Sequence, residues 1–574
     1  MPQQPRPAPE RPRTDLKGLI PGLTALALGV IMLGSALAPG YALGYDMVFV
    51  PHPPSSRAMF GLTGAFPRQV PSDAVIAGLA TVLPADLVQK LVLLLIFGLA
   101  GWGAARLVPG ERLLPRTAAA VFYVWNPYVA ERLLLGQWAL LLGYAGLPWA
   151  LSAAVSVNER HGPARLVRSL LPAAVGGFAA MNVSALVVGL GVLAAGAPHR
   201  GRRALKAGAV LIGLALPWLV PALLAGGHGR TDPAGVDLFA ARADTPFGSF
   251  GSLLSLGGIW NAEVVPPGYG TWFGATGRLV LSLTAIGAFG WALRNSTART
   301  PQLKGLAWAA ATGFGVACVG ITEPGRALVR GLVELWPGFG VLRDAHVYLA
   351  PLALLEAIGL GFLVLALSRM AVLALIAPIA LLPTLAWGMS GRLAAVDYPA
   401  DWARARTIIN GDPAGGLVLD LPWGAYRRFP WNGGRAVLDP LPRVLDRRVV
   451  WNDGLEVGSR ELAPEDPLTR AVDGLVRSSA PLTAPLGDAG YRYVVLEKVG
   501  RPDEAELRRR LQGARPVLDG RDLAIFRLDG SPAPVAEGTH LATVLTADLI
   551  AFLLVLWATT AYPPYFLVMR RTGS

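Results

Sequence analysis

The chain has 574 residues, of which 53% are hydrophobic and only 16% are charged, and its mean hydropathy is +0.46. These values exclude an ordinary soluble globular protein and indicate a polytopic membrane protein. The formal net charge of +13 does not indicate nucleic-acid binding, because the arginines form short clusters between apolar runs and make no basic stripe interleaved with aromatic residues. The lone cysteine, Cys318, excludes disulfides within the chain and cysteine-based zinc sites.

Apolar runs long enough to cross a bilayer recur along the chain. Residues 1–17 are polar, proline-rich and basic, and they predict a disordered cytoplasmic tail before an uncleaved first span. The single-helix candidates lie near 18–38, 87–106, 114–130, 138–157, 205–225, 272–293, 305–321, 347–368, 370–389 and 542–567.

Residues 169–197 are also apolar, but arginines flank them on both sides, at Arg165 and Arg168 before the run and from Arg200 to Lys206 after it. The positive-inside rule places both flanks in the cytoplasm. The run is therefore predicted to enter the membrane and return as two short helices that turn near Met181-Asn182. With this hairpin the chain has about 12 membrane segments. The same rule places both termini in the cytoplasm, and the expected location is the inner (plasma) membrane of the cell.

The prediction divides the chain into four parts. After the tail 1–17, residues 18–389 form a transmembrane domain of 11 segments, whose first outer loop is 39–86. Residues 390–540 have the composition of a soluble fold, and residues 541–574 supply the last helix and a cytoplasmic tail. Within 390–540, alternating strands and helices predict a small extracytoplasmic α/β domain, with strands at 416–420, 491–496 and 523–528 and a charged helix near 503–512.

The first outer loop places a carboxylate, Asp46 in Gly44-Tyr45-Asp46, just beyond the first span. A carboxylate at a membrane surface suits a general base, although it could instead cap or be solvated at the end of the first helix. His52 lies beside prolines and is either a simple loop residue or a ligand for a metal or a substrate. The loop also holds Arg57 and Arg68, and its residues 72–83 have the apolar spacing of a helix that lies along the membrane.

Three further clusters lie at predicted outer helix ends. Because ionisable groups at membrane depth are costly, Glu131 and Arg132 should face protein or a wet cavity, where they either pair with each other or bind an anionic headgroup. Arg343 could bind a phosphate or pair with Asp344. The polar and aromatic members of these clusters are Asn126, Glu131, Arg132 and Gln137; Arg343, Asp344 and His346; and Trp260, Glu263 and Tyr269 with Asp244.

The usual signatures of soluble enzymes do not occur: the sequence has no GxxxxGK[ST] phosphate loop, no HExxH pair and no GxSxG elbow between a strand and a helix. The plan of the chain resembles the GT-C superfamily of integral membrane glycosyltransferases, in particular the actinobacterial arabinofuranosyl- and mannosyltransferases and the related YfhO-type proteins. The residues that carry the resemblance are Gly44-Tyr45-Asp46, the stretch from Trp125-Asn126-Pro127-Tyr128 to Trp138, and Leu342-Arg343-Asp344.

The resemblance implies a GT-C-like fold and an inverting transfer of a sugar from a polyprenyl-phosphate donor to a cell-envelope polysaccharide or glycolipid at the outer membrane face. By position, Asp46 corresponds to the catalytic base. Arg132, Arg343, His346 and Arg57 are expected at the lipid phosphate. Tyr45, His52, Glu131, Asn126, Gln137, Trp260, Glu263 and Tyr269 are expected near the sugar or the acceptor, and aromatic residues of the α/β domain, Trp423, Tyr426, Trp431 and Trp451, near the growing polymer.

Asp46 has no acidic neighbour in the sequence, whereas many GT-C members carry a second acid. Asp73, Asp244 or Glu263 could serve as that acid, and the metal requirement stays open: no cofactor is certain, while a divalent cation, magnesium or manganese, is compatible with such a site. The other functional hypotheses are a transporter or flippase of lipid-linked glycans and a non-catalytic envelope assembly protein. A carrier needs polar residues through the middle of several spans, whereas here the ionisable groups gather at the outer ends.

Overall fold

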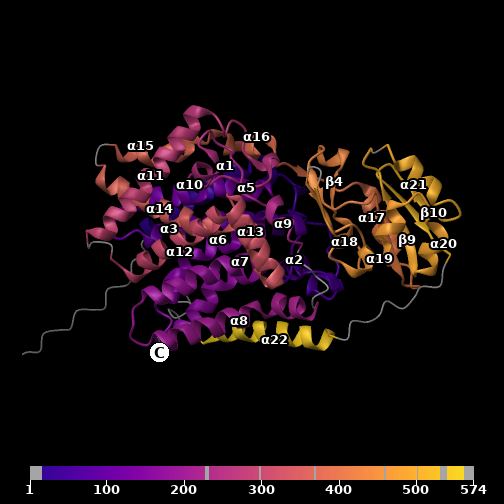
Figure 1. The fold of residues 1–574 in the computed structure, drawn as a ribbon, viewed down its shortest axis with the longest axis horizontal. Helices are drawn as coiled ribbons and strands as arrows, with labels where there is room; N and C mark the ends of the chain where they lie inside the picture. The colour runs from indigo at the N-terminus through magenta and orange to yellow at the C-terminus, as the bar shows by residue number, and fades with distance from the viewer. Residues whose placement is uncertain are drawn as a thin grey trace, which may run out of the picture.

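A helical body and a smaller α/β domain lie side by side in the computed structural model (Figure 1). The expected tail 1–17 lies almost wholly outside the described residues, as do the end of the last predicted segment, 542–567, and the tail after it. The structure describes residues 16–225, 232–295, 299–367, 370–457, 460–500, 502–529 and 540–561.

Within these residues, eight helices are long and apolar enough to cross a membrane, or up to ten spans if each of two bent helix pairs counts as one. The chain is therefore a multi-pass membrane protein, while the predicted total of about 12 segments is not confirmed. The eight are Lys17–Leu37, which contains α1 (Ile20–Leu33); α3 (Ala85–Leu107); α6 (Trp138–Val155); α7 (Gly162–Ala194); α8 (Arg200–Leu224); α11 (Trp272–Arg294); Ala345–Ala366, which contains α14 (Ala350–Ala366); and α22 (Leu541–Thr560).

Three predicted spans are interrupted. The candidate 114–130 divides into α4 (Leu113–Val124) and a separate short helix, α5 (Pro127–Leu134). The candidate 305–321 is α12 (Pro301–Val319), which bends by 98° into α13 (Glu323–Leu335). The candidate 370–389 is α15 (Ala371–Leu381), which bends by 61° into Pro383–Gly391. Hydropathy detects the apolar run in each case but does not register these breaks.

The long helix α7 consists of two antiparallel halves joined at Gly177, whose φ of 73° and ψ of −149° interrupt the helical backbone. In the first half Gly176 lies against Ala139, and Pro172 against Gly146, whereas in the second half Ala180 lies against Gly143 and Gly191 against Leu151. The chain thus runs down α6 in one direction and back in the other. The segment enters and returns as the flanking arginines predicted, but it turns at Gly177 rather than near Met181-Asn182.

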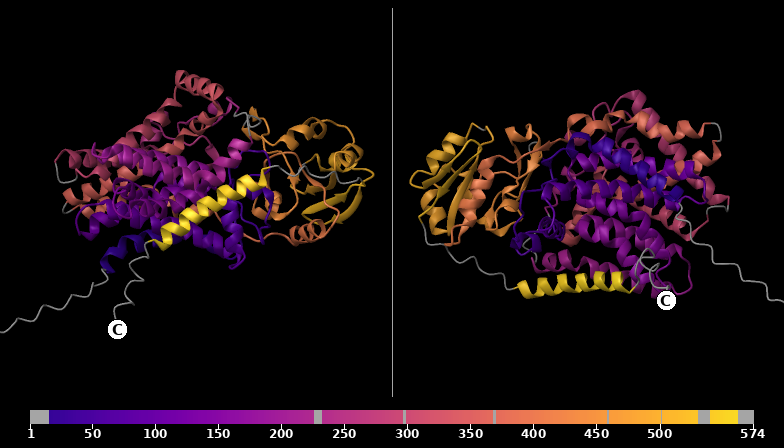
Figure 2. Two further views of the ribbon diagram at one scale, coloured as in Figure 1. Left: turned by 90° about the horizontal axis from the view of Figure 1, so that it is seen from below. Right: turned by 180° about the vertical axis from the view of Figure 1, so that it is seen from behind.

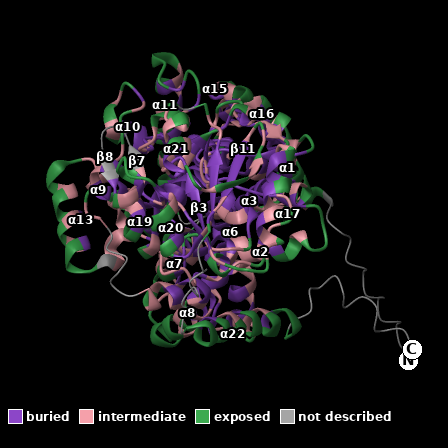
Figure 3. Ribbon diagram, turned by 90° about the vertical axis from the view of Figure 1, so that its right-hand side faces the viewer, coloured by how far each residue is buried: buried purple, intermediate pink, exposed green. Residues whose placement is uncertain are grey.

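α22 lies on the outside of the helical body, where it packs on α8 and α7 (Figure 2). Its outward face is apolar, with Leu549 and Phe552 more than half exposed, and the same helix is largely exposed in Figure 3. A helix that is apolar on its exposed side is suited to contact with lipid.

The α/β domain is built on a five-stranded mixed sheet in the order β10-β11-β9-β3-β6. The central strand β9 (Tyr491–Glu497) pairs in parallel with β3 (Leu417–Leu421), which pairs in parallel with β6 (Val449–Val450). On its other side β9 pairs antiparallel with β11 (Leu523–Arg527), next to β10 (Arg515–Asp519). The predicted strands and the predicted helix, α21 (Glu504–Arg510), are present. The other helices of the domain are α17 (Ala400–Asn410), α19 (Pro467–Arg477) and α20 (Thr483–Asp488).

Two short pairings join the first loop, between Leu37 and Ala85, to the α/β domain. β1 (Tyr41–Ala42) pairs antiparallel with β2 (Ala395–Val396), and Tyr45 forms a parallel bridge with Val437 of the hairpin β4 (Tyr426–Arg428) and β5 (Ala436–Leu438). The surface helix predicted in this loop is α2 (Ser72–Ala80), and its Asp73 makes an ion pair of 2.8 Å with Arg443 of α18 (Leu441–Val444). These contacts fix the loop between the two parts of the molecule.

Candidate functional site

Asp46 lies where the first loop, the junction of α5 with α6 and the hairpin β4–β5 meet. Its backbone N–H donates to the carbonyl of Leu135 at 3.1 Å. The approach depends on Gly136, which has a φ of 79° and whose missing side chain would collide with the backbone of Gly44 and Met47. The glycine thus lets the segment after α5 lie directly against Gly44-Tyr45-Asp46.

The carboxylate of Asp46 accepts two hydrogen bonds from outside its own loop. Tyr426 donates its phenol O–H to Oδ1 at 2.6 Å, and Gln137 donates from Nε2 to Oδ2 at 3.4 Å. Burial raises the pKa of Asp46 above its ordinary value, while these two hydrogen bonds and the charges of Arg68 and Arg443 act to lower it. Asp46 is therefore a half-buried carboxylate bound to two other segments, not a helix cap.

Arg132 is fully buried and its guanidinium is occupied by protein groups. Nη1 and Nη2 donate to the two carboxylate oxygens of Asp344 at 2.6 and 2.9 Å, and Nη1 also donates to Oε1 of Gln137 at 2.6 Å. A bidentate pair of this kind uses the fork of the guanidinium. Arg132 is expected at the lipid phosphate from the sequence, whereas in the structure both of its Nη groups bind protein acceptors, chiefly Asp344.

Glu131 and His346 lie on the inner side of Arg132, both buried. Nδ1 of His346 accepts from Arg132 Nη2 at 2.7 Å, so the ring proton is on Nε2, which lies 3.4 Å from Oε2 of Glu131. His346 also stacks on Tyr128, with ring centroids 5.5 Å apart. Both side chains are buried beside Arg132, and His346 supports Arg132 by accepting its hydrogen bond. Their expected places at the lipid phosphate and near the sugar stay predictions.

Arg343 differs from Arg132 although it precedes Asp344 in the same loop. Its guanidinium makes no hydrogen bond or ion pair with any residue that the structure describes, and it lies over the ring of Phe239 at 5.4 Å. Burial and the nearby charge of Arg68 lower its pKa to about 10, so it stays positively charged at neutral pH. An unpaired, partly buried guanidinium is the strongest candidate for binding an anion.

Arg68 belongs to the first loop and influences the pKa values of both Asp46 and Arg343. Its charge acts on both groups, and its own guanidinium pairs with Glu465 of the α/β domain. The side chain is half exposed. Arg68 was noted in the sequence only as a basic residue of the loop. Its proximity to Arg343, 275 positions later, has no signal in the sequence.

The predicted sugar-binding residues fall into two groups. Tyr45 donates its phenol O–H to Glu263 at 2.5 Å, and the exposed Glu263 also pairs with Arg428 at 2.7 Å, so these residues share a surface beside Asp46. Trp260 packs edge-on against Phe239, and the guanidinium of Arg343 lies over the ring of the same phenylalanine. This group lies beside the candidate site.

The second group lies away from that surface. Asn126 caps α5 by accepting from Val129 N–H, and its amide group donates to the carbonyls of Phe122 and Tyr123. Tyr269 is buried beneath the guanidinium of Arg278, 3.9 Å from its ring centroid. His52 is exposed on the first loop, and so is Arg57, which is expected at the lipid phosphate rather than at the sugar. Asn126 and Tyr269 are buried, and their expected roles near the sugar or the acceptor stay predictions.

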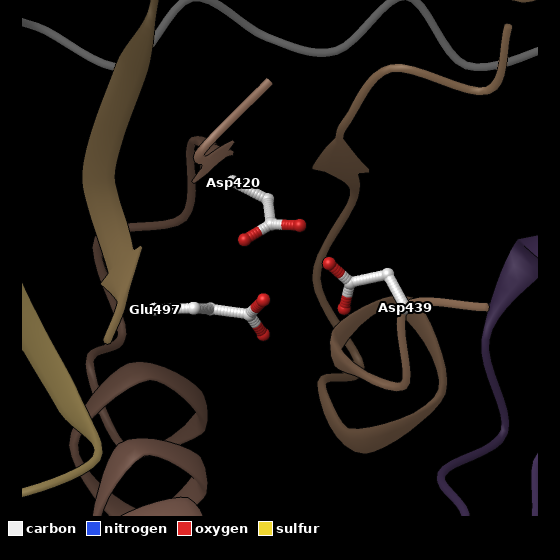
Figure 4. Close-up of side chains that lie close together, drawn as sticks. All are labelled: Asp420, Asp439 and Glu497. Carbon is white, nitrogen blue, oxygen red and sulfur yellow. The ribbon is translucent and has the colours of Figure 1, made fainter. Parts of the chain in front are cut away.

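Three buried carboxylates surround one guanidinium in the α/β domain. Figure 4 shows the side chains of Asp420, Asp439 and Glu497 turned toward one another, and Arg427 of β4 pairs with them at 3.1, 2.9 and 2.8 Å. Burial, together with the neighbouring carboxylates, raises the pKa of Asp420 and Glu497. Among the described residues this is the one group of three or more acids, histidines or cysteines with the spacing of a metal site, and it does not include Asp46. Because Arg427 supplies the positive charge, we assign the cluster to anchoring β4.

The structure resembles solved structures of one arabinofuranosyltransferase. It matches the arabinofuranosyltransferase AftD from mycobacteria with a TM-score of 0.54 at 17% identity, and a variant of that protein with a TM-score of 0.53 at 18% identity. The chain has a GT-C-like fold. Both alignments cover 90% of this chain, which spans 40% and 42% of the length of the two matched chains.

The GT-C-like fold confirms the predicted fold class of a mainly helical membrane protein with an α/β domain. A further similar structure is the oligosaccharyltransferase from Archaeoglobus fulgidus, at 12% identity with a TM-score of 0.42, covering 84% of this chain and 69% of that one. No protein-family model and no curated protein matches the sequence. The evidence for what this GT-C-like chain does therefore has to come from the site itself.

Proposed function

We propose that the chain is an inverting glycosyltransferase that moves a sugar from a polyprenyl-phosphate donor to a cell-envelope polysaccharide or glycolipid. The observation that supports this proposal is the placement of a half-buried carboxylate, Asp46, and a guanidinium that pairs with no described residue, Arg343, on two loops that are joined through protein hydrogen bonds. The joining groups are Gln137, Arg132 and Asp344.

In the proposed reaction, Asp46 accepts the proton of an acceptor hydroxyl as the hydroxyl oxygen attacks the anomeric carbon of the donor sugar. The new carbon–oxygen bond forms on the face opposite the phosphate, and the bond to the phosphate oxygen breaks with its electron pair leaving on the lipid phosphate. A positioned base of this kind contributes roughly 10²–10⁴-fold. The raised pKa of Asp46 brings its basicity closer to neutral pH.

The lipid phosphate would bind Arg343 and Arg68. The first is unpaired and the second is half exposed, so both have N–H groups free to turn toward an anion. Two guanidinium groups held in a partly desolvated position offset the negative charge that grows on the leaving phosphate. Arg132 contributes by fixing Asp344, and through it the loop that carries Arg343. In this proposal Arg132 is a support for the donor site and not its ligand.

The acceptor would approach over Tyr45, Glu263 and Trp260, which lie beside Asp46 and Phe239. Hydroxyl groups of a sugar suit the phenol and the carboxylate, while an aromatic face suits a sugar ring. The surrounding membrane lipids keep the polyprenyl chain next to the helical body. A divalent cation that binds the donor phosphate is compatible with this arrangement, and no step of the reaction above depends on it.

For the orientation, we propose that both termini are cytoplasmic in the inner (plasma) membrane and that the α/β domain is extracytoplasmic. The two halves of α7 support this orientation, since they return the arginines at both of its flanks to the same side. The site then opens at the outer face, where lipid-linked sugars and envelope acceptors meet.

The test is a transfer assay with purified protein in lipid vesicles, supplied with radiolabelled polyprenyl-phosphate pentose or hexose. Asp46→Asn should lower turnover by about 100-fold or more while leaving the donor KM nearly unchanged. The matched control is Asp519→Asn, the same chemical change in an exposed ion pair of the α/β domain, which should keep the wild-type rate. Unchanged transfer by Asp46→Asn would overturn the proposal. Movement of intact lipid-linked glycan across the vesicle membrane without transfer would favour a carrier.

A further inference from the structure

We propose that Tyr426 of the α/β domain is a positioning residue for Asp46, so that the site is complete only when the hairpin β4–β5 is bound to the first loop. This inference rests on the proposed function and adds to it a role for the α/β domain at the reacting carboxylate. From the sequence alone, Tyr426 is expected near the growing polymer, together with other aromatic residues of the domain.

The two hydrogen bonds to the carboxylate of Asp46 differ in length, and this difference decides which carboxylate oxygen is free to react. The phenol of Tyr426 lies 2.6 Å from Oδ1, a short hydrogen bond to a charged group. Gln137 lies 3.4 Å from Oδ2, at the weak end of the range. Tyr426 therefore fixes Oδ1 and the plane of the carboxylate, and Oδ2 remains as the oxygen that takes the acceptor proton.

The hairpin is joined to the first loop through the backbone. Tyr45 N–H donates to the carbonyl of Ala436 at 2.6 Å, and Leu438 N–H donates to the carbonyl of Tyr45 at 2.9 Å. The ring of Tyr426 also packs against that of Tyr45, with centroids 5.8 Å apart. Asp46 and Tyr426 are 380 positions apart in the chain, and these contacts give their side chains a fixed relation.

The opposite side of β4 anchors the hairpin to the sheet. Side chains alternate along a strand, so Tyr426 and its neighbour Arg427 point to opposite faces. Arg427 pairs with Asp420 of β3, with Asp439 just after β5 and with Glu497 at the end of β9. Figure 4 shows these three carboxylates together. Breaking a buried pair of this kind is strongly unfavourable. Arg427 therefore anchors one face of β4 to the sheet, while Tyr426 on the other face points toward Asp46.

The charged and titratable groups that act on Asp46 come from three segments: Tyr426 of β4, Arg68 of the first loop and Arg443 of α18. Glu465 and Asp453 of the α/β domain act in turn on Arg68. The hydrogen bond from Tyr426 acts with the two arginines to favour the ionised form of Asp46, against its burial. Removing the phenol hydroxyl alone should leave the arginines in place and shift the titration upward.

The experiment measures the protonation of Asp46 directly, without any substrate. A carbodiimide reacts with protonated carboxyl groups, so the labelling of the Asp46 peptide as a function of pH, read by mass spectrometry, gives a midpoint. Tyr426→Phe should raise this midpoint by about one pH unit. Tyr493→Phe is the matched control, because Tyr493 donates to the distant Asp412 at 2.7 Å, and it should leave the midpoint of Asp46 unchanged.

Replacing Tyr426 with 3,5-difluorotyrosine keeps the side chain's shape and makes the phenol a stronger donor, so it should move the midpoint downward. In the transfer assay, Tyr426→Phe should lower kcat, move the acidic limb of the pH profile upward and leave the donor KM unchanged. A Tyr426→Phe protein with the wild-type midpoint and pH profile overturns the inference, even if Asp46→Asn abolishes transfer. Transfer that survives Asp46→Asn overturns both the inference and the proposed function.

Discussion

α5 and the loop before α14 each place an arginine next to Asp344, and the two arginines are in opposite states. Arg132 of α5 is fully buried and bonded to Asp344, Gln137 and His346, whereas Arg343 of the loop pairs with no described residue. Both residues looked like phosphate ligands in the sequence. The difference indicates that a buried charge with protein partners serves the structure, whereas a charge without a described partner is the better candidate for binding a ligand.

The largest expected effect separates the two arginines by stability. Arg132→Met leaves the partly buried Asp344 without its partner and should lower the free energy of unfolding by about 3–5 kcal/mol. Arg343→Met removes a charge that has no hydrogen-bond or ion-pair partner among the described residues, and it should leave the stability unchanged or slightly higher. Thermal unfolding of both variants in the same detergent measures the difference. Equal losses would mean that Arg343 is also a structural residue.

The second effect concerns the donor. Arg343→Gln should raise the donor KM by about 10- to 100-fold, because a hydrogen bond to a charged group contributes about 1.5–3 kcal/mol. Arg343→Lys should recover part of this loss, since it restores the charge but not the planar fork. Steady-state kinetics with varied donor and saturating acceptor make the comparison. A donor KM that is insensitive to residue 343 contradicts the placement of the phosphate.

The third effect depends on pH. Burial, with the charges of Asp466 and Glu465, raises the pKa of Asp453 to about 6 in the folded protein, above its unfolded value. The native state therefore binds the proton more tightly, and stability falls as pH rises from about 4 through about 6. Asp453→Asn keeps an acceptor for the N–H groups of Glu465 and Asp466, and it should add roughly 1–3 kcal/mol at pH 7.5 but almost nothing at pH 4. Unfolding curves at both pH values test the sign.

The smallest effect is expected for the ion pair of Glu263 and Arg428. Like Arg132 and Asp344 it joins an arginine to a carboxylate, but it is exposed to solvent. Both side chains are more than half exposed, and such pairs contribute less than about 1 kcal/mol. Glu263→Gln should therefore leave the unfolding temperature nearly unchanged. Any effect should appear instead in the acceptor KM. A large loss of stability would show that this pair holds the hairpin on the first loop.

The sequence predicted those features that depend on local composition or on charge order. Arginines on both flanks of the apolar run showed that α7 returns, because the positive-inside rule depends only on the order of charges and apolar runs. The turn was misplaced by several residues, since the positive φ of Gly177 is a backbone property that a run of small residues conceals. The break at Asn126 was missed for a different reason: Asn126-Pro127 has the sequence of a helix start, an N-cap followed by proline at the first helical position, but the apolar run continues across it.

The candidate site was only partly predictable. Asp46 was found because its position after the first span is visible in one dimension, although its role stays a prediction. The pairing of Arg132 with Asp344 joins residues 212 positions apart, and the contact of Tyr426 with Asp46 joins residues 380 positions apart. Such partners depend on how the α/β domain binds the first loop, which no local pattern specifies. The same applies to Arg68 and Arg343.

The most direct test is a structure of the protein with a non-cleavable polyprenyl-phosphonate sugar in lipid. We expect the phosphorus group within hydrogen-bonding distance of Arg343 and Arg68, the sugar between it and Asp46, and Arg132 still bonded to Asp344. A phosphonate bound at another surface would contradict the proposed roles of the two arginines. So would a phosphonate that displaces Asp344 from Arg132 and makes no contact with Arg343.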